Sequence, residues 1–391
     1  MKTIVFFCIP AHGHTNPTLG VVRELVSRGH RIIYYSYEIF RDKIEAAGAE
    51  FIPCDDYNME QTLSPGDAAR LGSDLAFSTK ILVDTTLALD EKVCQDMMIL
   101  QPDCIVADSM AVWGKAVAMK LGIPFVSSTT TFAFNQQSAR VIPQPSKDLL
   151  KMILGMIRAN RHVRRLKNRG YPVKNVLDII SNDSHTHTIV YTSPEFQPCA
   201  DTFDPEYYCF VGPSLRPSAQ EWQKTKDILV YISMGTVNND LLPLYRSCID
   251  ALGKTPWQVI MSVGNQVDMD VFGRLPENVS VYTHVDQIAV LQKADVFLTH
   301  CGMNSVSEAL WYGVPLVMNP KTSEQQGVAH QAASLGAGIH LKEETPETIL
   351  EAIRNVLETP AFRKQAQCIS DSFHSCPGAS GAADKILSVC K

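Results

Sequence analysis

The sequence alternates short apolar segments with helical segments from its first residues. Residues 4–9 form a continuous apolar run rich in branched and aromatic side chains, and residues 19–26 follow with apolar side chains at helical spacing. Strand patterns recur at residues 31–36, 104–107 and 125–127, with helical segments between them. Strands that alternate with helices pair in parallel, with right-handed crossovers and helices on both faces of the sheet. The chain is therefore expected to begin with a doubly wound α/β domain.

The same alternation starts again in the second half of the chain. Strand patterns at residues 228–233 and 257–263 precede two more at 296–299 and 315–318. Helical segments lie between these strands and after them, and residues 346–391 are helical by pattern. A second doubly wound α/β domain is the simplest architecture that fits this repetition.

Residues 211–222 read VGPSLRPSAQEW, and their Gly, Pro and Ser content is typical of a linker between domains. The length of 391 residues also favours two domains, because one hydrophobic core rarely serves more than about 250–300 residues. We predict two facing Rossmann-like domains with a cleft between them. The boundary is placed between residues 1–215 and 216–391, and the final helix is free to pack back on the first domain.

Composition narrows the range of partners. The formal net charge of -6 disfavours a nucleic-acid partner, which needs concentrated Lys and Arg. The 11 cysteines include no CxxC pair, which fits buried free thiols in a reducing compartment. No stretch reaches the ~18 apolar residues of a membrane span, and the amino-terminal run lacks the features of a signal peptide. We therefore expect a cytoplasmic protein without an integral membrane segment.

One segment departs from the acidic average. Residues 149–169 are helical by pattern and carry Arg158, Arg161, His162, Arg164 and Arg165, followed by two further cations. Such a run indicates either an anionic partner or a solvated helix face. The solvated face is the more common case, and the role of residues 158–169 stays open at this point.

The loop after the first strand, PAHGHTNP, carries two histidines. In a parallel sheet this loop lies at the carboxyl edge, where open α/β sheets bind ligands. Gly13 allows the backbone to approach a ligand, and Thr15 or Asn16 is expected to cap the helix that follows. Imidazole accepts a proton near neutral pH when a second group fixes its tautomer. Asp108 directly follows the strand at residues 104–107 and therefore reaches the same carboxyl edge of the sheet. We favour a dyad of Asp108 with His14 over one with His12.

A second constellation, His300-Cys301-Gly302-Met303-Asn304-Ser305, stands where another strand ends and a helix begins. Free backbone N–H groups and the positive end of the helix dipole make this position suitable for an anion. A capped helix without a ligand is the alternative. The chain contains neither a GxxxxGK[ST] loop nor a GxGxxG motif after its first strand, so an ordinary P-loop or dinucleotide fingerprint is excluded.

The stretch from His284 to Gln325 resembles the donor-binding signature of the family one glycosyltransferases, which use nucleotide-sugar donors. The matching residues are Val285, Gln287, Leu291, His300, Cys301, Gly302, Asn304, Ser305, Glu308, Gly313, Val314, Pro315, Pro320, Glu324 and Gln325. The PAHGHTNP loop and the VGPSL linker resemble the bacterial macrolide glycosyltransferase branch. The resemblance covers nearly the whole chain and implies the GT-B fold of two facing Rossmann-like domains.

The resemblance also implies roles for individual residues. His14 is the general base and Asp108 the residue that orients it. Glu308 binds the ribose, and Glu324 with Gln325 binds sugar hydroxyls. The donor-binding positions implied in full are Gly13, Thr15, Gly235, Thr236, His284, Val285, Gln287, His300, Gly302, Met303, Asn304, Ser305, Glu308, Glu324 and Gln325.

Three residues depart from the family pattern. His284 stands where plant members stack a tryptophan on the nucleobase, Asp286 stands where proline is usual and is expected to loosen the loop, and Glu324 replaces an aspartate. The glutamine at position 325 is common in enzymes that use UDP-glucose. The identity of the nucleobase and of the sugar is therefore less constrained than the diphosphate site.

The expected reaction is an inverting transfer of a sugar, with glucose from a UDP-sugar favoured, to a hydroxyl of a small apolar acceptor such as a flavonoid, macrolide or steroid. A β-glycoside results, no metal is required, and the protein is expected to be a monomer or weak dimer. Met110, Trp113, Phe132 and Phe134 follow strand ends in the first domain and are candidates for the acceptor pocket, although a core role is equally consistent with them. Two alternatives remain: a nucleotide-sugar 2-epimerase and a non-catalytic glycosyltransferase-like partner protein.

Overall fold

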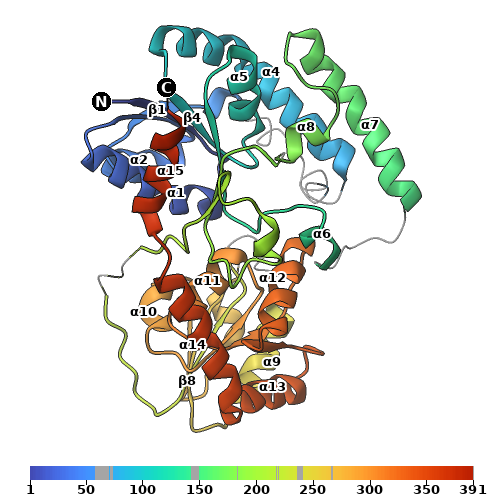
Figure 1. The fold of residues 1–391 in the computed structure, drawn as a ribbon. Helices are drawn as coiled ribbons and strands as arrows, with labels where there is room; N and C mark the ends of the chain where they lie inside the picture. The colour runs from blue at the N-terminus through green and yellow to red at the C-terminus, as the bar shows by residue number, and fades with distance from the viewer. Residues whose placement is uncertain are drawn as a thin grey trace.

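A computed structural model provides the fold and describes residues 1–57, 70, 74–141, 149–182, 184–216, 218, 220–235, 241–265 and 267–390. Thr236, one of the predicted donor-binding residues, lies outside the described residues. The chain forms two lobes, an amino-terminal one above and a carboxyl-terminal one below in Figure 1.

The amino-terminal lobe is built on a seven-stranded parallel sheet with the order β3-β2-β1-β4-β5-β6-β7. Its strands are β1 (Thr3–Phe7), β2 (Arg31–Ser36), β3 (Glu50–Pro53), β4 (Cys104–Asp108), β5 (Phe125–Thr129), β6 (Thr188–Val190) and β7 (Tyr208–Phe210). The accompanying helices are α1 (His12–Ser27), α2 (Arg41–Ala46), α4 (Leu75–Leu100), α5 (Val112–Leu121), α6 (Ser138–Val141), α7 (Leu149–Asn168) and α8 (Leu177–Ile180).

The carboxyl-terminal lobe has a six-stranded parallel sheet with the order β10-β9-β8-β11-β12-β13. Its strands are β8 (Leu229–Ser233), β9 (Gln258–Ser262), β10 (Val279–Tyr282), β11 (Val296–Thr299), β12 (Leu316–Met318) and β13 (Gly338–His340). The accompanying helices are α9 (Leu242–Leu252), α10 (Gln287–Leu291), α11 (Met303–Trp311), α12 (Ser323–Ser334), α13 (Pro346–Glu358) and α14 (Pro360–His374), while α15 (Gly378–Val389) follows them in the chain. Two doubly wound parallel sheets confirm the predicted fold class.

The strand order locates the chemistry. In the first sheet the direction of winding reverses between β1 and β4, and in the second sheet between β8 and β11. Open α/β sheets bind ligands at such switch points, outside the carboxyl ends of the strands. The register pairs Phe7 with Ala107 and Ser233 with Thr299, so the loops that follow these strands start side by side. His14, Asp108, Gly235 and His300 all lie at these four strand ends or shortly after them.

The last helix returns to the first lobe. Ala382, Ala383 and Ile386 of α15 belong to the core built on the first sheet. Arg28 at the end of α1 binds Asp384 through Nη1 at 2.5 Å and Ser380 Oγ through Nη2 at 2.8 Å. Figure 1 shows α15 beside α1 in the upper lobe. The chain therefore crosses between the lobes twice, before β8 and after α14.

The longest helix, α4, has no counterpart in the predicted elements. It packs against α5 on one side and α7 on the other, so apolar side chains are spread around it and the one-sided period of an amphipathic helix is weak. In contrast, α7 follows the range predicted from its basic pattern closely. No helix among the described residues is long and apolar enough to cross a membrane.

Candidate active site

The loop after β1 is shorter than expected, because α1 begins at His12. The residue before the helix is Ala11, and no side chain caps the helix amino terminus. The predicted cap by Thr15 or Asn16 is therefore wrong. Thr15 is fully buried and its hydroxyl donates to Cys8 Sγ at 3.5 Å, so its side chain faces the core rather than a donor. The early start of α1 places His14 in the first helical turn.

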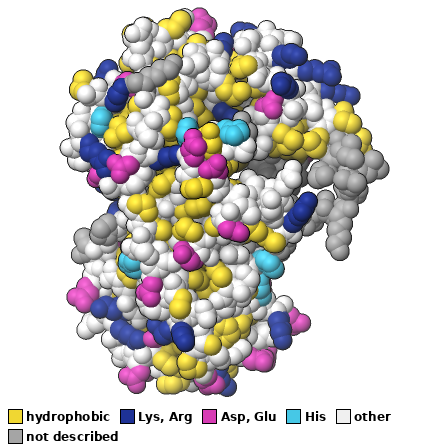
Figure 2. Space-filling view, viewed as in Figure 1, with side chains coloured by type: hydrophobic (Ala, Val, Ile, Leu, Met, Phe, Trp, Pro, Cys, Tyr) yellow, Lys and Arg dark blue, Asp and Glu magenta, His cyan; other side chains and the backbone are white. Residues whose placement is uncertain are grey.

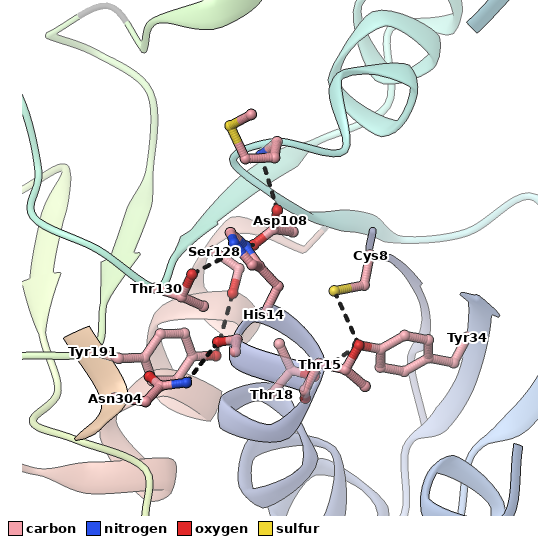
Figure 3. A network of polar contacts seen from close by, with 12 residues as sticks. Cys8, His14, Thr15, Thr18, Tyr34, Asp108, Ser128, Thr130, Tyr191 and Asn304 are labelled. Carbon is pink, nitrogen blue, oxygen red and sulfur yellow. Dashed lines mark hydrogen bonds and ion pairs between the residues drawn. The ribbon is translucent and has the colours of Figure 1, made fainter. Parts of the chain in front are cut away.

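His14 and Asp108 meet directly. His14 Nδ1 lies 2.8 Å from Asp108 Oδ2, and the side chain of Asp108 is completely buried while that of His14 keeps 21% of its surface exposed. Asp108 Oδ1 accepts a hydrogen bond from the backbone N–H of Met110 at 2.9 Å, which fixes the carboxylate. Thr130 Oγ1 lies 3.1 Å from the same His14 nitrogen (Figure 3).

This geometry defines the state of the imidazole. An ionised carboxylate only accepts hydrogen bonds, so the proton of neutral His14 is on Nδ1 and the lone pair is on Nε2. Within the described part of the chain Nε2 has no hydrogen-bond partner. Burial lowers the pKa of His14, but the charge and hydrogen bond of Asp108 outweigh burial, and the pKa is raised. The Nε2 lone pair of His14 is thus able to accept a proton.

His12 lies apart from this dyad. Its ring packs edge-on against Phe40 at 4.9 Å between centroids. Burial and the charge of Lys43 lower its pKa. Among the described residues, no carboxylate supports an imidazolium at His12, so the geometry favours His14 over His12 as the partner of Asp108.

In the carboxyl-terminal lobe, the loop after β11 leads into α11. Gly302 is the residue before the helix, and neither Asn304 nor Ser305 caps it. The first backbone N–H groups of the helix therefore have no intrahelical partner and face the positive end of the dipole. Asn304 Nδ2 donates to the carbonyl of Gly13 at 3.0 Å. This hydrogen bond joins the start of α11 to the residue next to His14 (Figure 3).

Two glycines make room for His300. A Cβ added to Gly235 would lie 2.6 Å from the His300 ring, and one added to Gly302 would lie 2.7 Å from His300 Nε2. Gly235 also has φ +84°, a conformation that favours glycine. Burial lowers the pKa of His300, so the ring is neutral at pH 7. The loops after β8 and β11 are thus fitted to each other around this imidazole.

Glu308 sits in a polar cluster one turn further along α11. Gln287 donates through Nε2 to Glu308 Oε2 at 2.5 Å and accepts from the Tyr231 hydroxyl at 3.1 Å. Burial raises the pKa of Glu308 to about 7, although the Gln287 hydrogen bond and the charge of Arg216 oppose the rise. The carboxyl group thus titrates near neutral pH. Arg216, in the segment between the lobes, was not among the predicted site residues.

Asp286 fastens its loop, although its replacement of proline predicted a looser one. Its Oδ1 accepts the backbone N–H of Ala289 at 3.3 Å and caps α10. Its Oδ2 accepts the hydroxyl of Ser218 at 2.9 Å. The expectation that this residue loosens the loop is therefore wrong, because both of its oxygens fasten the loop.

The remaining donor residues differ in exposure. His284 is exposed at the end of β10, where a base can stack on it, while the side chains of Val285 and Met303 are buried in the core of the lobe. The latter two can meet a ligand only through their backbone.

The two residues predicted to bind the sugar lie at the start of α12. Glu324 is close enough to His14 for the charge of each to act on the other. Desolvation by the surrounding protein raises the pKa of the Glu324 carboxyl group, although the charge of His14 opposes the rise. Gln325 completes a capping box, with Oε1 accepting the N–H groups of Lys321 at 2.8 Å and Thr322 at 3.1 Å. Within the described part of the chain, its Nε2 has no hydrogen-bond partner.

The four candidates for the acceptor pocket divide into two pairs. Trp113 is 4% exposed in the core of the first lobe, and Phe132 is 3% exposed and packs on Phe196, which in turn contacts Phe373. Both are packing residues, and their assignment to the acceptor pocket is corrected. Met110 and Phe134 are exposed.

Thr130, which lies beside the dyad, is a residue that the sequence did not predict. Its only signal was a run of hydroxyl side chains, Ser127 to Thr131, at the carboxyl end of β5 beside β4. Among the described residues, no group of three His, Cys, Asp or Glu side chains is placed to hold a metal ion.

Comparisons with known proteins identify the family of the chain. Residues 246–389 match the family model of the erythromycin biosynthesis protein CIII-like C-terminal domain. The chain is 34% identical to NDP-glycosyltransferase YjiC of Bacillus licheniformis, over 98% of this chain and 97% of the relative. It is 30% identical to the uncharacterized UDP-glucosyltransferase YojK of Bacillus subtilis, over 100% of this chain and 98% of the relative.

Among solved structures, the glycotransferase of kitacinnamycin superposes with a TM-score of 0.83 at 26% identity, covering 100% of this chain and 99% of that one. These relatives favour sugar transfer over the epimerase and the non-catalytic partner. The dyad in one lobe, the helix amino terminus in the other and the full-length similarity lead to one conclusion: the chain belongs to the bacterial macrolide branch of the family one glycosyltransferases, and it is a nucleotide-sugar-dependent glycosyltransferase with a GT-B fold.

Proposed function

We propose that the protein transfers glucose from UDP-glucose to a hydroxyl group of a small apolar acceptor, with inversion, to give a β-glycoside. The observation that carries the proposal is the contact between the two halves of the site. His14 and Asp108 form a dyad in the first lobe, and Asn304 of the second lobe bonds to Gly13, the residue next to His14. A donor held at the start of α11 is therefore presented to the base.

The transfer follows from this arrangement. His14 Nε2 takes the proton of the acceptor hydroxyl as its oxygen attacks the anomeric carbon. The bond from that carbon to the diphosphate breaks on the opposite face, and UDP leaves with the electron pair. Asp108 stabilises the imidazolium, as a buried carboxylate 2.8 Å from Nδ1 is placed to do.

Neutral hydrogen-bond donors stabilise the negative charge on the leaving group. The free N–H groups at the start of α11, the side chain of Ser305 and the ring of His300 lie at the same loop, and a helix dipole favours an anion there. We propose that no divalent metal is required. Transfer that continues in excess EDTA supports this, and loss of transfer restored by Mg²⁺ contradicts it.

Glucose and UDP are proposed on three grounds. YojK, a relative along the whole chain, is described as a UDP-glucosyltransferase. We propose that Glu308, which lies on α11 in contact with Gln287, binds the ribose hydroxyls, and that Glu324, whose charge acts on His14, binds sugar hydroxyls together with Gln325. His284 is exposed for stacking on the base.

The acceptor is proposed to be apolar because Met110 and Phe134 are exposed in the first lobe, after β4 and β5. We also propose that the protein works in the cytoplasm as a monomer or weak dimer. All eleven cysteines are free, which is compatible with a reducing compartment.

Mass spectrometry of a matrix of reactions tests the proposal. Several nucleotide sugars are each paired with a panel of hydroxylated flavonoid, macrolide and steroid acceptors, and each donor is also incubated alone. We expect an acceptor that gains one hexose in the reactions with UDP-glucose. Conversion of the sugar in the donor-only reactions would instead support an epimerase, and absence of product with every donor would overturn the proposal.

A further inference from the structure

The strongest feature that the active site leaves unused is the outer face of α7. Residues 149–169 contain seven Lys and Arg residues and no Asp or Glu, in a chain whose formal net charge is -6. Figure 1 places α7 at the outer edge of the upper lobe. Figure 2 shows Lys and Arg side chains gathered over this part of the molecule, with hydrophobic side chains beside them.

The helix separates its side chains by face. Ala159, Val163 and Leu166 are buried against the lobe. The exposed side chains recur at spacings of three and four, which places them on the opposite side of the helix. They are Leu154, Ile157, Arg158, Arg161, Arg164 and Arg165, and together they define the α7 outer face.

Most of this charge is not neutralised by the protein. Arg165 binds Asp84, which also binds Lys80. Arg158, Arg161 and Arg164 make no ion pair with the described residues. Three arginines thus point into solvent within about two turns of one helix, where they attract an anionic partner.

The same face exposes apolar side chains. Leu154 is 44% and Ile157 51% exposed, although both are large hydrophobic residues. The neighbouring α8 adds exposed Leu177 and Ile180, and it is joined to α7 by a hydrogen bond from the Val176 N–H to Asn160 Oδ1 at 2.7 Å. Exposed apolar side chains thus occur on α7 and on the neighbouring α8.

We propose that the α7 outer face docks this protein on an anionic membrane surface. Arginines bind lipid headgroups there, while leucine and isoleucine enter the boundary between headgroups and acyl chains, the arrangement of helices that lie in a membrane interface. A purely anionic partner such as an acidic protein accounts for the arginines but leaves the apolar side chains unused. The helix lies on the bilayer and does not cross it.

Docking through the α7 outer face has a functional consequence. In Figure 1, α7 and α6 lie on the same side of the molecule, and α6 follows the loop that carries the exposed Phe134. A docked protein thus holds this loop near a surface in which apolar compounds accumulate. The inference goes beyond the proposed function, and vesicle binding is measured without any substrate.

Co-sedimentation with vesicles tests the inference. The full chain is mixed with vesicles of phosphatidylcholine alone and with vesicles containing 30% phosphatidylglycerol, at low and high salt. We expect binding only to the anionic vesicles, and loss of binding at high salt. Each arginine near such a surface changes the binding constant by about fivefold, so the variant with Arg158, Arg161 and Arg164 all replaced by Ala is expected to bind on the order of 100-fold more weakly.

A matched control removes three exposed lysines from the other lobe, Lys254, Lys342 and Lys364, each to Ala. The control is expected to bind vesicles like the unmodified protein, and circular dichroism with thermal unfolding verifies that both variants are folded. A second variant, Ile157→Ser, is expected to weaken binding while keeping the charge. Failure of the unmodified protein to bind anionic vesicles, equal binding by the arginine variant, or binding to polyglutamate in place of vesicles would overturn the inference.

Discussion

Replacing Asp108 by Asn tests the dyad at the level of single atoms. Asp108 Oδ1 accepts the Met110 N–H at 2.9 Å and Oδ2 faces His14 Nδ1 at 2.8 Å. An asparagine that keeps the first bond turns its NH₂ group toward His14. The imidazole then accepts at Nδ1 and carries its proton on Nε2, the nitrogen that must take the acceptor proton. The fold is preserved, but the base is in the wrong tautomer.

The size of the effect follows from the geometry. Two unit charges 2.8 Å apart attract by about 6 kcal/mol at an effective dielectric constant of about 20. Part of this is offset by desolvation, and breaking a buried pair costs about 3–5 kcal/mol in practice. If this cost falls on the transition state, kcat is expected to drop by about 10² to 5 × 10³.

The assay is the pH profile of kcat/KM, once a substrate pair is known. Asp108 raises the pKa of His14 and burial lowers it, and the base must be unprotonated to work. The acid limb of the profile should therefore move to lower pH in Asp108→Asn, together with the drop in rate. A rate within tenfold of the unmodified protein, or an acid limb that does not move, would refute the assignment of Asp108.

Three further predictions address other parts of the site. Because the pKa of Glu308 is raised to about 7, its carboxylate should be mostly protonated at pH 6, and calorimetry should show UDP binding up to about tenfold weaker at pH 6 than at pH 8, a dependence absent in Glu308→Gln. Thr130→Val removes a hydroxyl 3.1 Å from His14 Nδ1 and should lower kcat about three- to tenfold without changing UDP affinity, as steady-state kinetics and calorimetry would show. Gly235→Ala puts a Cβ 2.6 Å from the His300 ring at φ +84°, and UDP affinity should fall by about tenfold or more in the same calorimetric assay; unchanged affinity would show that the His300 ring is not needed for the diphosphate.

Much of the fold could be predicted because each lobe repeats one local pattern. Buried parallel strands read as apolar runs, and glycines mark the ends of several helices, so the two sheets were recognisable. Helix α4 was not, since it is covered by helices on two sides and has no clear polar face. The start of α1 was misplaced because the Thr and Asn of its first turn resemble caps, whereas Thr15 points into the core.

The site was predictable where a residue lies at the end of a strand or shortly after it. His14, Asp108 and His300 stand at the switch points of the two sheets, and topology brings such positions together. Thr130 and Arg216 could not be found in this way. Thr130 reaches His14 only because β5 lies beside β4, and Arg216 acts on Glu308 from a segment without regular structure. Likewise, sequence alone could not separate exposed Phe134 from buried Phe132, because the burial of each depends on the packing between the lobes.

The central claim is that His14 of one lobe deprotonates the acceptor hydroxyl that attacks a donor bound by the other lobe. Replacing His14 by Ala and measuring both transfer and UDP affinity on the same preparation tests it most directly. We expect transfer to fall by about 10² to 10⁴, because the general base is gone, while the dissociation constant for UDP stays within about threefold. Transfer at the rate of the unmodified protein, with UDP affinity unchanged, would contradict the account.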